Sequence, residues 1–284
     1  MFVVIAENES GERLQLSQNI NYDVVKIDGL NPPSATLNTT AVAGYDGEQY
    51  NSGRINTRNI VLTIVINPDI ETNRLNLYKI FRTKQYIKLY FKNNSRNVFI
   101  DGRIETIECD YFAIRQTMQI SIICFQPYFC EVNSNAILTH KTPMLEFPVE
   151  FLPEGIEFST INDDPKIKVI NSGEVETGMF IILRAIGGDV HKPTIYNSRT
   201  SEKIELNVDT LSEGAEIRIN TNKGERSIWL ITELGYGENI INTLSRDSTW
   251  LQLNVGENVF EYTTYSGDEN LEIDIIYNNK YQGV

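Results

Sequence analysis

Paired carboxylates are the most frequent candidates for chemistry in this sequence. Two facing carboxyl groups can act as the acid and base of a glycosidase, and clustered oxygens can hold calcium. Asp163-Asp164, Glu202/Glu205 and Asp268-Glu269 have this composition. The chain has 38 Asp and Glu residues, so neighbouring pairs arise by chance, and none has the spacing of an EF-hand loop. We therefore interpret these pairs as solvated surface.

Nucleophilic and metal-binding side chains are few. His140 and His191 are the two histidines, and the three cysteines, Cys109, Cys124 and Cys130, form no CxxC pair. No GxSxG, HExxH, P-loop or GxGxxG motif opening a helix is present. We expect no enzyme, no catalytic residue, no cofactor and no metal. The cysteines are expected to be small buried hydrophobes of a protein made in a reducing compartment.

Three aromatic residues suggest a binding function instead. Trp229, Tyr236 and Trp250 could stack on sugar rings, as aromatic platforms on β-sandwiches do. Trp250 stands at the head of an apolar run, where a core aromatic is expected. We favour core packing over glycan contact for this set.

The elements that must position these residues divide into two domains. The chain has 284 residues, 41% of them hydrophobic, which disfavours disorder. Nearly all of the net charge of −13 lies in the second half, and Pro143 falls where the composition changes. We predict an N-terminal domain over residues 1–130, a linker over 131–146 and an acidic domain over 147–284.

The N-terminal domain is predicted to be mainly β with one helix. Asn67-Pro68-Asp69 predicts a helix start, with Asn67 as the N-cap, and the helix is expected to run to about Arg82. The runs of apolar residues expected to form its main strands are 3–6, 24–27, 36–42, 59–66, 87–91, 98–105 and 118–125.

The acidic domain is predicted to be a two-sheet β-sandwich. Its last residues alternate apolar with polar side chains between turns rich in Gly, Asn, Asp and Ser, which is typical of antiparallel strands with one buried face. The strand runs expected here are 166–170, 180–186, 194–197, 203–206, 215–220, 227–231, 251–255, 259–265 and 271–275.

One connection in the N-terminal domain is longer than a simple turn requires. About fifteen residues, Gly44 to Arg58, join two apolar strands, and a connection of this length is usually mobile or used for contact. The candidate contact residues in it are Gly44, Tyr45, Asp46, Gly47, Tyr50, Arg54 and Arg58. An ordinary surface loop remains the alternative.

Several stretches, taken in their order and spacing, resemble phage distal tail proteins. In the second half the resemblance is carried by Asn171-Ser172-Gly173, Thr177-Gly178, Pro193-x-Ile195-x-Asn197, Gly214-x-x-Ile217-x-Ile219, Asp247-Ser248-x-Trp250-Leu251, Gly256-x-Asn258-x-Phe260 and Tyr281-x-Gly283-Val284. In the first half it is carried by Gly44-Tyr45-Asp46-Gly47, Arg58-x-Ile60 and Gln126-Pro127-Tyr128.

The resemblance implies a fold and an assembly. It implies an N-terminal β-barrel or split-sandwich domain and a C-terminal sandwich of jelly-roll type, similar to galectins and carbohydrate-binding modules. It further implies a structural virion protein that forms a homohexameric ring at the distal end of the tail. The implied partners are the tail tube protein, the tail-tip hub protein and receptor-binding or other baseplate proteins, and residues 44–58 would form an arm that pairs with the neighbouring subunit.

Other functional classes fit the sequence less well. No apolar run is long enough to cross a membrane, and no secretion signal is recognisable, so assembly in the host cytoplasm is expected. Neither half has the basic patch that sequence-specific nucleic-acid binding needs, although DNA could pass through a ring lumen. The alternatives are a carbohydrate-binding protein for a host surface glycan and, less favoured, a glycan-cleaving enzyme.

Overall fold

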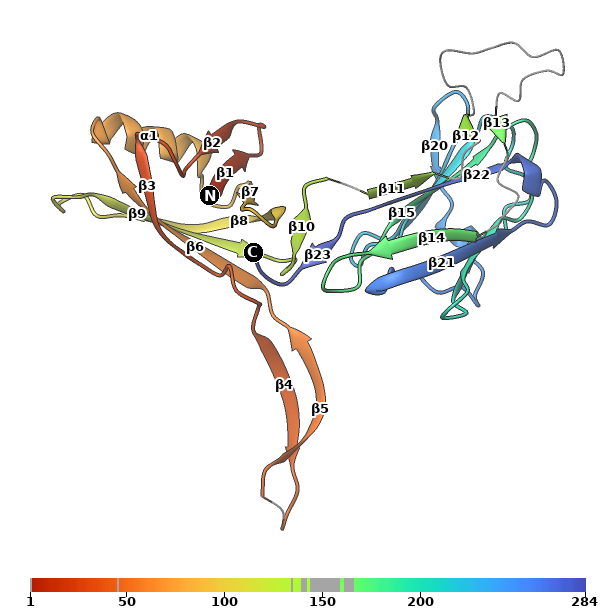
Figure 1. The fold of residues 1–284 in the computed structure, drawn as a ribbon, viewed down its shortest axis with the longest axis horizontal. Coiled ribbons are helices and arrows are strands. Elements are labelled where there is room, and N and C mark those ends of the chain that lie inside the picture. Colours follow the sequence, from red (N-terminus) through yellow and green to blue (C-terminus); the bar gives the residue numbers. More distant parts are fainter. Residues whose placement is uncertain (1, 45, 134, 139–141, 144–158, 161–165) are drawn as a thin grey trace. The chain divides into compact units, whose positions relative to one another are not determined.

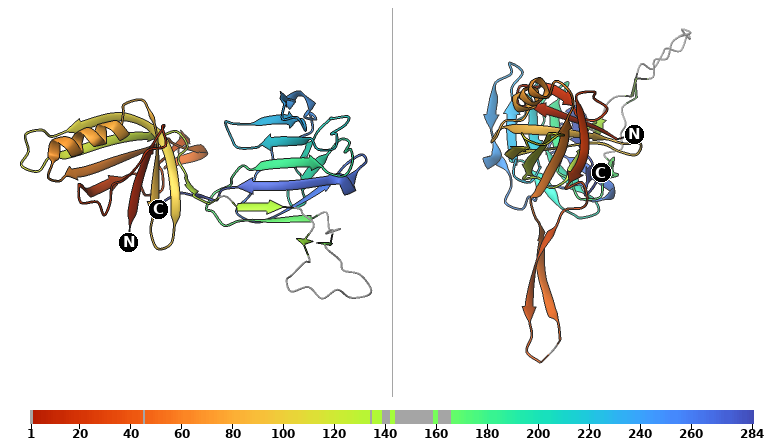
Figure 2. Two further views of the ribbon diagram at one scale, coloured as in Figure 1. Left: turned by 90° about the horizontal axis from the view of Figure 1, so that it is seen from above. Right: turned by 90° about the vertical axis from the view of Figure 1, so that its left-hand side faces the viewer.

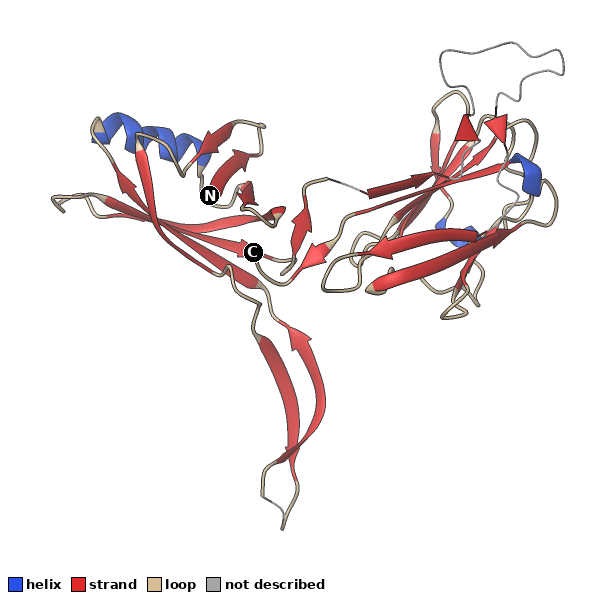
Figure 3. Cartoon of the chain, viewed as in Figure 1, coloured by secondary structure: helices blue, strands red, loops and turns tan. Residues whose placement is uncertain are grey.

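The computed structural model describes residues 2–44, 46–133, 135–138, 142–143, 159–160 and 166–284. The described chain is mainly β with one α-helix (Figure 3), as the sequence predicts. Two compact units divide it: Met1–Val132 together with Lys280–Val284, and Asn133–Asn279. Residues 280–284, predicted to belong to the C-terminal domain, lie in the first unit. Parts of the predicted linker, residues 134, 139–141 and 144–146, lie outside the described residues.

An antiparallel nine-stranded sheet forms the first unit. Its main path runs β2-β1-β7-β8-β9-β6-β3, with β10 pairing β8 and β23. The strands are β1 (Val3–Asn8), β2 (Arg13–Gln15), β3 (Tyr22–Asp28), β6 (Arg58–Ile66), β7 (Tyr86–Lys92), β8 (Asn97–Cys109), β9 (Thr117–Cys124), β10 (Phe129–Glu131) and β23 (Lys280–Tyr281). Within the described chain, β2 and β3 end this path without pairing each other, so the barrel among the predicted options is not closed.

Alternating side chains explain why this sheet has a buried and an outer face. In β7, Ile87, Leu89 and Phe91 are fully buried, whereas Lys88 and Tyr90 between them are not. Successive side chains of a strand point to opposite faces, so one face of β7 joins the core and the other faces outward.

The single helix begins later than the sequence predicts. α1 spans Ile70–Ile80, and Asp69 precedes it in the left-handed conformation with φ 66° and no capping side-chain bond. Asn67, the predicted N-cap, instead donates from its side-chain amide to the carbonyl of Ile20 at 3.0 Å. Because Asp69 is left-handed, helical backbone starts only after it. Leu77 then packs the helix into the core.

Two further strands of the first unit form a separate hairpin. β4 (Ala35–Ala41) and β5 (Glu48–Ile55) pair only with each other among the described residues. The hairpin extends away from the nine-stranded sheet in Figures 1 and 2, and we call residues 35–55 the arm. Its register shifts after Asn38, and such a bulge increases strand twist.

The second unit contains a six-stranded and a four-stranded antiparallel sheet. Their orders are β11-β22-β15-β18-β19-β20 and β14-β21-β16-β17, and β12 pairs with β13 separately. The strands are β11 (Asn135–Leu138), β12 (Thr142–Pro143), β13 (Ser159–Thr160), β14 (Lys166–Asn171), β15 (Phe180–Ala185), β16 (Thr194–Asn197), β17 (Lys203–Glu205), β18 (Glu216–Asn220), β19 (Ser227–Ile231), β20 (Gly237–Asn239), β21 (Gly256–Thr263) and β22 (Leu271–Tyr277). Two 3-10 turns, η1 (Ile241–Thr243) and η2 (Asp268–Asn270), complete the unit.

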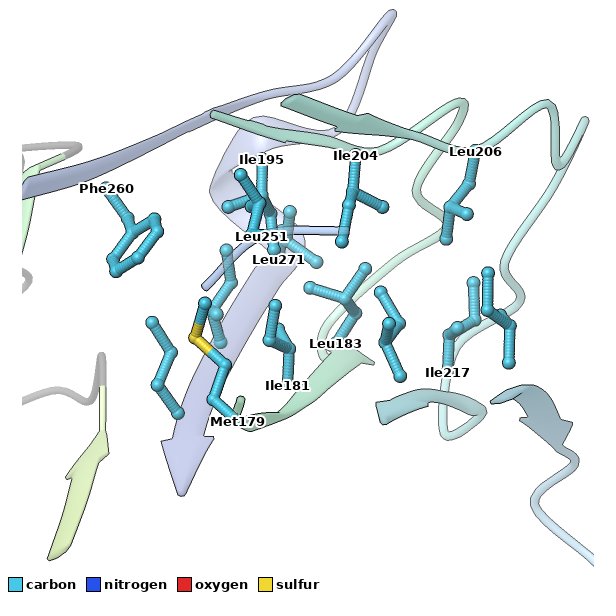
Figure 4. Close-up of a cluster of buried hydrophobic side chains, with 14 of the residues drawn as sticks. Met179, Ile181, Leu183, Ile195, Ile204, Leu206, Ile217, Leu251, Phe260 and Leu271 are labelled. Carbon is cyan, nitrogen blue, oxygen red and sulfur yellow. The ribbon is translucent and has the colours of Figure 1, made fainter. Parts of the chain in front are cut away.

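Apolar side chains of both larger sheets share one core. Ile181 and Leu183 of the six-stranded sheet meet Ile195 and Phe260 of the four-stranded sheet (Figure 4). This packing is the sandwich that the alternating pattern predicts. The run 251–255 is not a ladder strand, although Leu253 is buried and makes an isolated bridge to Thr177.

Candidate functional site

The arm is fully exposed along both of its strands. Every residue of β4 and β5 is solvent-exposed, including Leu37 and Tyr50, each with 62% of its surface accessible. A two-stranded hairpin with no packed face is at best marginally stable in water. The arm therefore has the properties of a contact element that gains stability from a partner.

The two faces of the arm differ in chemistry. By register, one face carries Thr36, Asn38, Thr40, Gln49, Ser52 and Arg54, and the other carries Ala35, Leu37, Thr39, Ala41, Glu48, Tyr50, Gly53 and Ile55. On the first face Asn38 donates to Ser52 at 3.0 Å, and the bulged Asn51 donates to Thr40 at 2.6 Å. Polar groups there bond to one another across the strands. On the second face Thr39 donates to Glu48, while Leu37 and Tyr50 remain exposed to water.

Most of the predicted contact residues lie on this hairpin. Gly44 and Gly47 have φ of 85° and 90°, the left-handed region that glycine adopts without strain, and they shape the turn beside Asp46. Tyr50 and Arg54 lie on β5. Tyr45 lies outside the described residues.

Arg58 was grouped with the arm by the sequence analysis, but it does not lie on it. It begins β6 and is 3% exposed. Its Nε donates to the carbonyl of Pro127 at 2.7 Å and its Nη1 to that of Asn31 at 2.7 Å. The guanidinium stacks over Phe129, 4.5 Å from the ring centroid. Arg58 is therefore an internal anchor, and its guanidinium is not available to a neighbouring subunit.

The same guanidinium joins the segment before the arm to the C-terminal residues. Nη1 also donates to the carbonyl of Gly29, and Nη2 donates to that of Gln282 at 2.6 Å. Burial lowers the pKa of Arg58, but an arginine remains protonated in proteins. Arg96 holds the same C-terminal segment, since it donates to the carbonyl of Gly283 and lies 4.5 Å over the ring of Tyr281.

A groove on the outer face of β1, β7 and β8 was missed by the sequence analysis. It has a volume of about 450 Å³, and its lining includes Arg13, Lys88, Tyr90, Lys92 and Phe99. The alternation of Lys88, Tyr90 and Lys92 along β7 was the available signal. The alternation alone could not reveal the groove, because pairing with β1 and β8 supplies its other walls.

The three aromatic candidates of the second unit occupy different settings. Trp229 lies on β19 and Tyr236 in the turn before β20, and both are exposed. Trp250 is half-buried against the core and lies beneath Arg226, whose guanidinium carbon is 5.5 Å from the ring. The structure thus places Trp250 in packing and leaves Trp229 and Tyr236 on one hairpin.

Among the described residues, the paired acids and His191 form no metal-binding group. Lys203 donates to Glu205 at 2.6 Å, and His191 contacts the carbonyl of Asp209. Asp163, Asp164 and His140 lie outside the described residues. In the part of the chain that the structure describes, no group of three His, Cys, Asp or Glu side chains could hold a metal ion, and no helix is long and apolar enough to span a membrane.

Both halves of the chain match models of phage tail domains. A model described as "Siphovirus-type tail component, C-terminal domain" matches residues 172–281, and one described as "Phage tail protein RIFT-related domain" matches residues 9–108. Together they define a structural component of a phage tail. The chain belongs to the phage distal tail protein family, as the resemblance in its sequence indicates.

Solved structures share the whole fold at low sequence identity. SPP1 Dit (gp 19.1), described as a paradigm of the hub adsorption apparatus in phages that infect Gram-positive hosts, matches with a TM-score of 0.69 and 12% identity over 99% of both chains. Chains of the phage P2 baseplate in its activated conformation match over the full length of both chains. Their TM-scores are 0.57 with Ca, at 10% identity, and 0.55 with Sr, at 11% identity. No curated protein sequence matches the chain.

Proposed function

We propose that this protein forms a hexameric ring at the distal end of a phage tail and closes the ring through its arms. The observation that carries the proposal is the arm itself, a hairpin whose two strands are exposed throughout and pack on nothing among the described residues. A two-stranded hairpin is only marginally stable alone, and its exposed apolar side chains favour contact with another surface. Assembly would bury this apolar face. The family and the fold of SPP1 Dit support a ring that belongs to the tail hub.

The arm suits a head-to-tail ring better than a two-fold dimer. In a head-to-tail interface the donating and accepting surfaces of each subunit differ, and the assembly closes when the rotation between subunits completes a circle. The arm leaves the first unit between β3 and β6, at one end of the strand order, so its partner surface can lie elsewhere on the next copy. Six copies are the number that the family resemblance implies.

The two units would divide the remaining tasks. The first unit would form the ring and join the tail tube on one side and the tail-tip hub on the other. The sandwich of the second unit would dock receptor-binding or other baseplate proteins. We propose no enzymatic activity and no cofactor, because both halves of the chain match structural tail components. Subunits would be made in the host cytoplasm and incorporated into the virion during assembly.

Removal of the arm tests this proposal. Leu37 to Gly53 would be replaced by a short Gly-Ser turn, which keeps Arg58 and its backbone partners and closes a short loop at little entropic cost. The variant should melt within a few degrees of the parent, because the arm adds nothing to either core. In sedimentation velocity it should lose the ring. A variant that retains the parent's oligomeric mass would show that the arm is an ordinary surface hairpin.

A matched control separates loss of the arm from general damage. Leu234 and Tyr236 lie in an exposed turn of the second unit, outside the proposed ring surfaces. Replacing both by Ser removes a comparable amount of exposed apolar surface. This control should assemble as the parent does. The parent protein, imaged with negative stain beside the tail tube protein, should show six-fold rings with an open centre.

A further inference from the structure

The groove on β1, β7 and β8 combines an apolar floor with cations. Val3, Ile5 and Phe99 line its floor, and Arg13, Lys88 and Lys92 supply its charge. The Nζ of Lys88 lies 4.6 Å from the ring centroid of Phe99, and this contact holds the ammonium over the groove. Concave surfaces that are apolar and bear a few charged groups at fixed positions are typical binding sites.

The groove lining itself contains no carboxylate. Two carboxylates lie near it on the same face: Glu7 accepts from Tyr90 at 3.1 Å and pairs with Arg13, and Asp101 stands opposite Lys88 in the strand register. Lys92 stands opposite Asn97, at the end of the strand pair. The positive charge is therefore least compensated around Lys92, and an anionic ligand would approach there.

The tip of the arm has the complementary chemistry. It carries Asp46 and Glu48, both exposed, and Tyr50 follows on the apolar face. No Lys or Arg occurs between Ala41 and Arg54. The carboxylates of Asp46 in the turn and Glu48 on β5, with the ring of Tyr50, match two lysines and an apolar floor in both charge and polarity.

We propose that this groove receives the acidic tip of the arm from a second copy of the chain. The proposal rests on the proposed ring and names the surface to which the arm binds. In the strand order of the sheet, the arm leaves beside β3 and β6, whereas the groove lies over β1, β7 and β8 toward the other end. Donor and acceptor are thus different surfaces of one subunit, as a head-to-tail ring requires.

The dimensions of the arm are compatible with this contact. Its paired residues run from the Ala35–Ile55 pair to the Ala41–Glu48 pair, which corresponds to roughly 20 Å at about 3.3 Å per residue. This length places Asp46 and Glu48 well away from Ala35 and Ile55, where the arm joins the rest of the first unit. Electrostatic contacts of exposed side chains weaken as salt increases, so assembly through this contact should depend on ionic strength.

A charge-exchange experiment tests the proposal. The groove variant combines Lys88→Gln, which keeps an aliphatic stem over Phe99, with Lys92→Glu; the tip variant combines Asp46→Lys with Glu48→Lys. Each should raise the protein concentration at half assembly by about tenfold or more in sedimentation velocity at low salt. Combining the two should recover part of the lost assembly, since the carboxylate introduced at position 92 then faces the lysines introduced at the tip.

Three controls make the result decisive. Lys79→Glu changes an exposed lysine on α1, away from the groove lining, and should leave assembly unchanged. Melting temperatures report whether the groove variant folds. If it does not, Lys92→Glu alone and the tip variant, both confined to exposed positions, still test the contact.

The outcomes separate this proposal from the ring itself. Parent rings together with no effect of either variant, or no recovery in the combination, overturn the groove contact and leave the ring standing. A parent that stays monomeric overturns both. A labelled single-stranded oligonucleotide that binds the parent and is lost in the groove variant, with assembly unchanged, assigns the groove to nucleic acid and overturns the contact.

Discussion

The guanidinium of Arg58 donates to the carbonyl of Gln282 at 2.6 Å, although 224 positions separate the two residues in the chain. The same side chain bonds carbonyls of Gly29, Asn31 and Pro127. One buried cation thus joins the segment before the arm, the segment after β9 and the C-terminal residues. The hydrogen bonds around it, and not a carboxylate partner, compensate its charge.

Replacing Arg58 by Met should destabilise the first unit. Four backbone carbonyls would lose a donor in a buried setting, where each unpaired acceptor costs about 1–3 kcal/mol, so we expect a loss of at least about 3 kcal/mol in the free energy of unfolding. Urea titration followed by circular dichroism measures it. Arg54→Met, at an exposed position on the arm, is the matched control and should change the value by less than about 0.5 kcal/mol. Equal effects of the two substitutions would show that the Arg58 bonds do not stabilise the fold.

The local pattern of the sequence predicted elements well and long-range contacts poorly. Alternation along β7 and β22 predicted strands because period two is visible within a few residues. Arg58 was misplaced because it follows the arm in sequence, whereas its environment is made by Gln282 and Phe129, which no local pattern connects to it. The start of α1 was missed because the left-handed backbone of Asp69 carries no signature in its side chain.

The candidate site was likewise predictable only in part. The length and polarity of residues 44–58 indicated a contact element, but β4 was assigned to the body of the domain, and the arm includes it. The groove could not be predicted, since Val3, Lys88 and Phe99 come from three strands that only the fold brings together.

The second unit should fold as an isolated fragment when its limits follow the structure. A fragment of residues 133–279 retains β11, which pairs with β22, and omits residues 280–284, which lie in the first unit. It should show a single cooperative melt.

A fragment of residues 145–284 lacks β11, which leaves β22 as an exposed edge strand, so this fragment should melt lower and aggregate more readily. Both tryptophans lie in this unit, so their fluorescence follows its unfolding. Equal stability of the two fragments would argue against the limits drawn here.

Alkaline pH should destabilise the first unit. Burial raises the pKa of the Cys124 thiol to about 12 and, with the Asp101 charge, that of the Tyr86 hydroxyl to about 12. Folding therefore favours the protonated forms. Each group's contribution to the free energy of unfolding is complete below its unfolded-state pKa, near 8.5 for Cys124 and near 10 for Tyr86. The contribution is lost as pH rises toward the folded-state pKa.

The stability change can be assigned to one group by substitution. The unfolding free energy of the parent should fall between pH 8 and pH 10, and Cys124 alone should contribute about 2 kcal/mol of that fall. Cys124→Ala should lower stability at pH 8 and flatten the slope above it. Cys109→Ala, at a half-buried position, is the comparison. A slope that is unchanged in Cys124→Ala would contradict the assignment.

Arg184, whose side chain is 32% exposed, pairs with the buried carboxylate of Asp274, and loss of the arginine alone should be costly. Asp274 is 4% exposed, accepts from Arg184 Nη1, and has a second carboxylate oxygen without a hydrogen-bond partner in the structure. Arg184 Nε also donates to Glu216 at 3.1 Å.

Arg184→Leu leaves the Asp274 carboxylate buried without its cation, so it should cost about 3–5 kcal/mol. The double variant Arg184→Leu/Asp274→Leu removes both charges and should recover most of that loss, because apolar pairs of similar volume often replace buried ion pairs without cost. Tryptophan fluorescence during urea unfolding measures each variant, and the coupling energy of the cycle gives the interaction. Additive losses in the double variant would mean that the two side chains act independently and that Asp274 is stabilised by something other than Arg184.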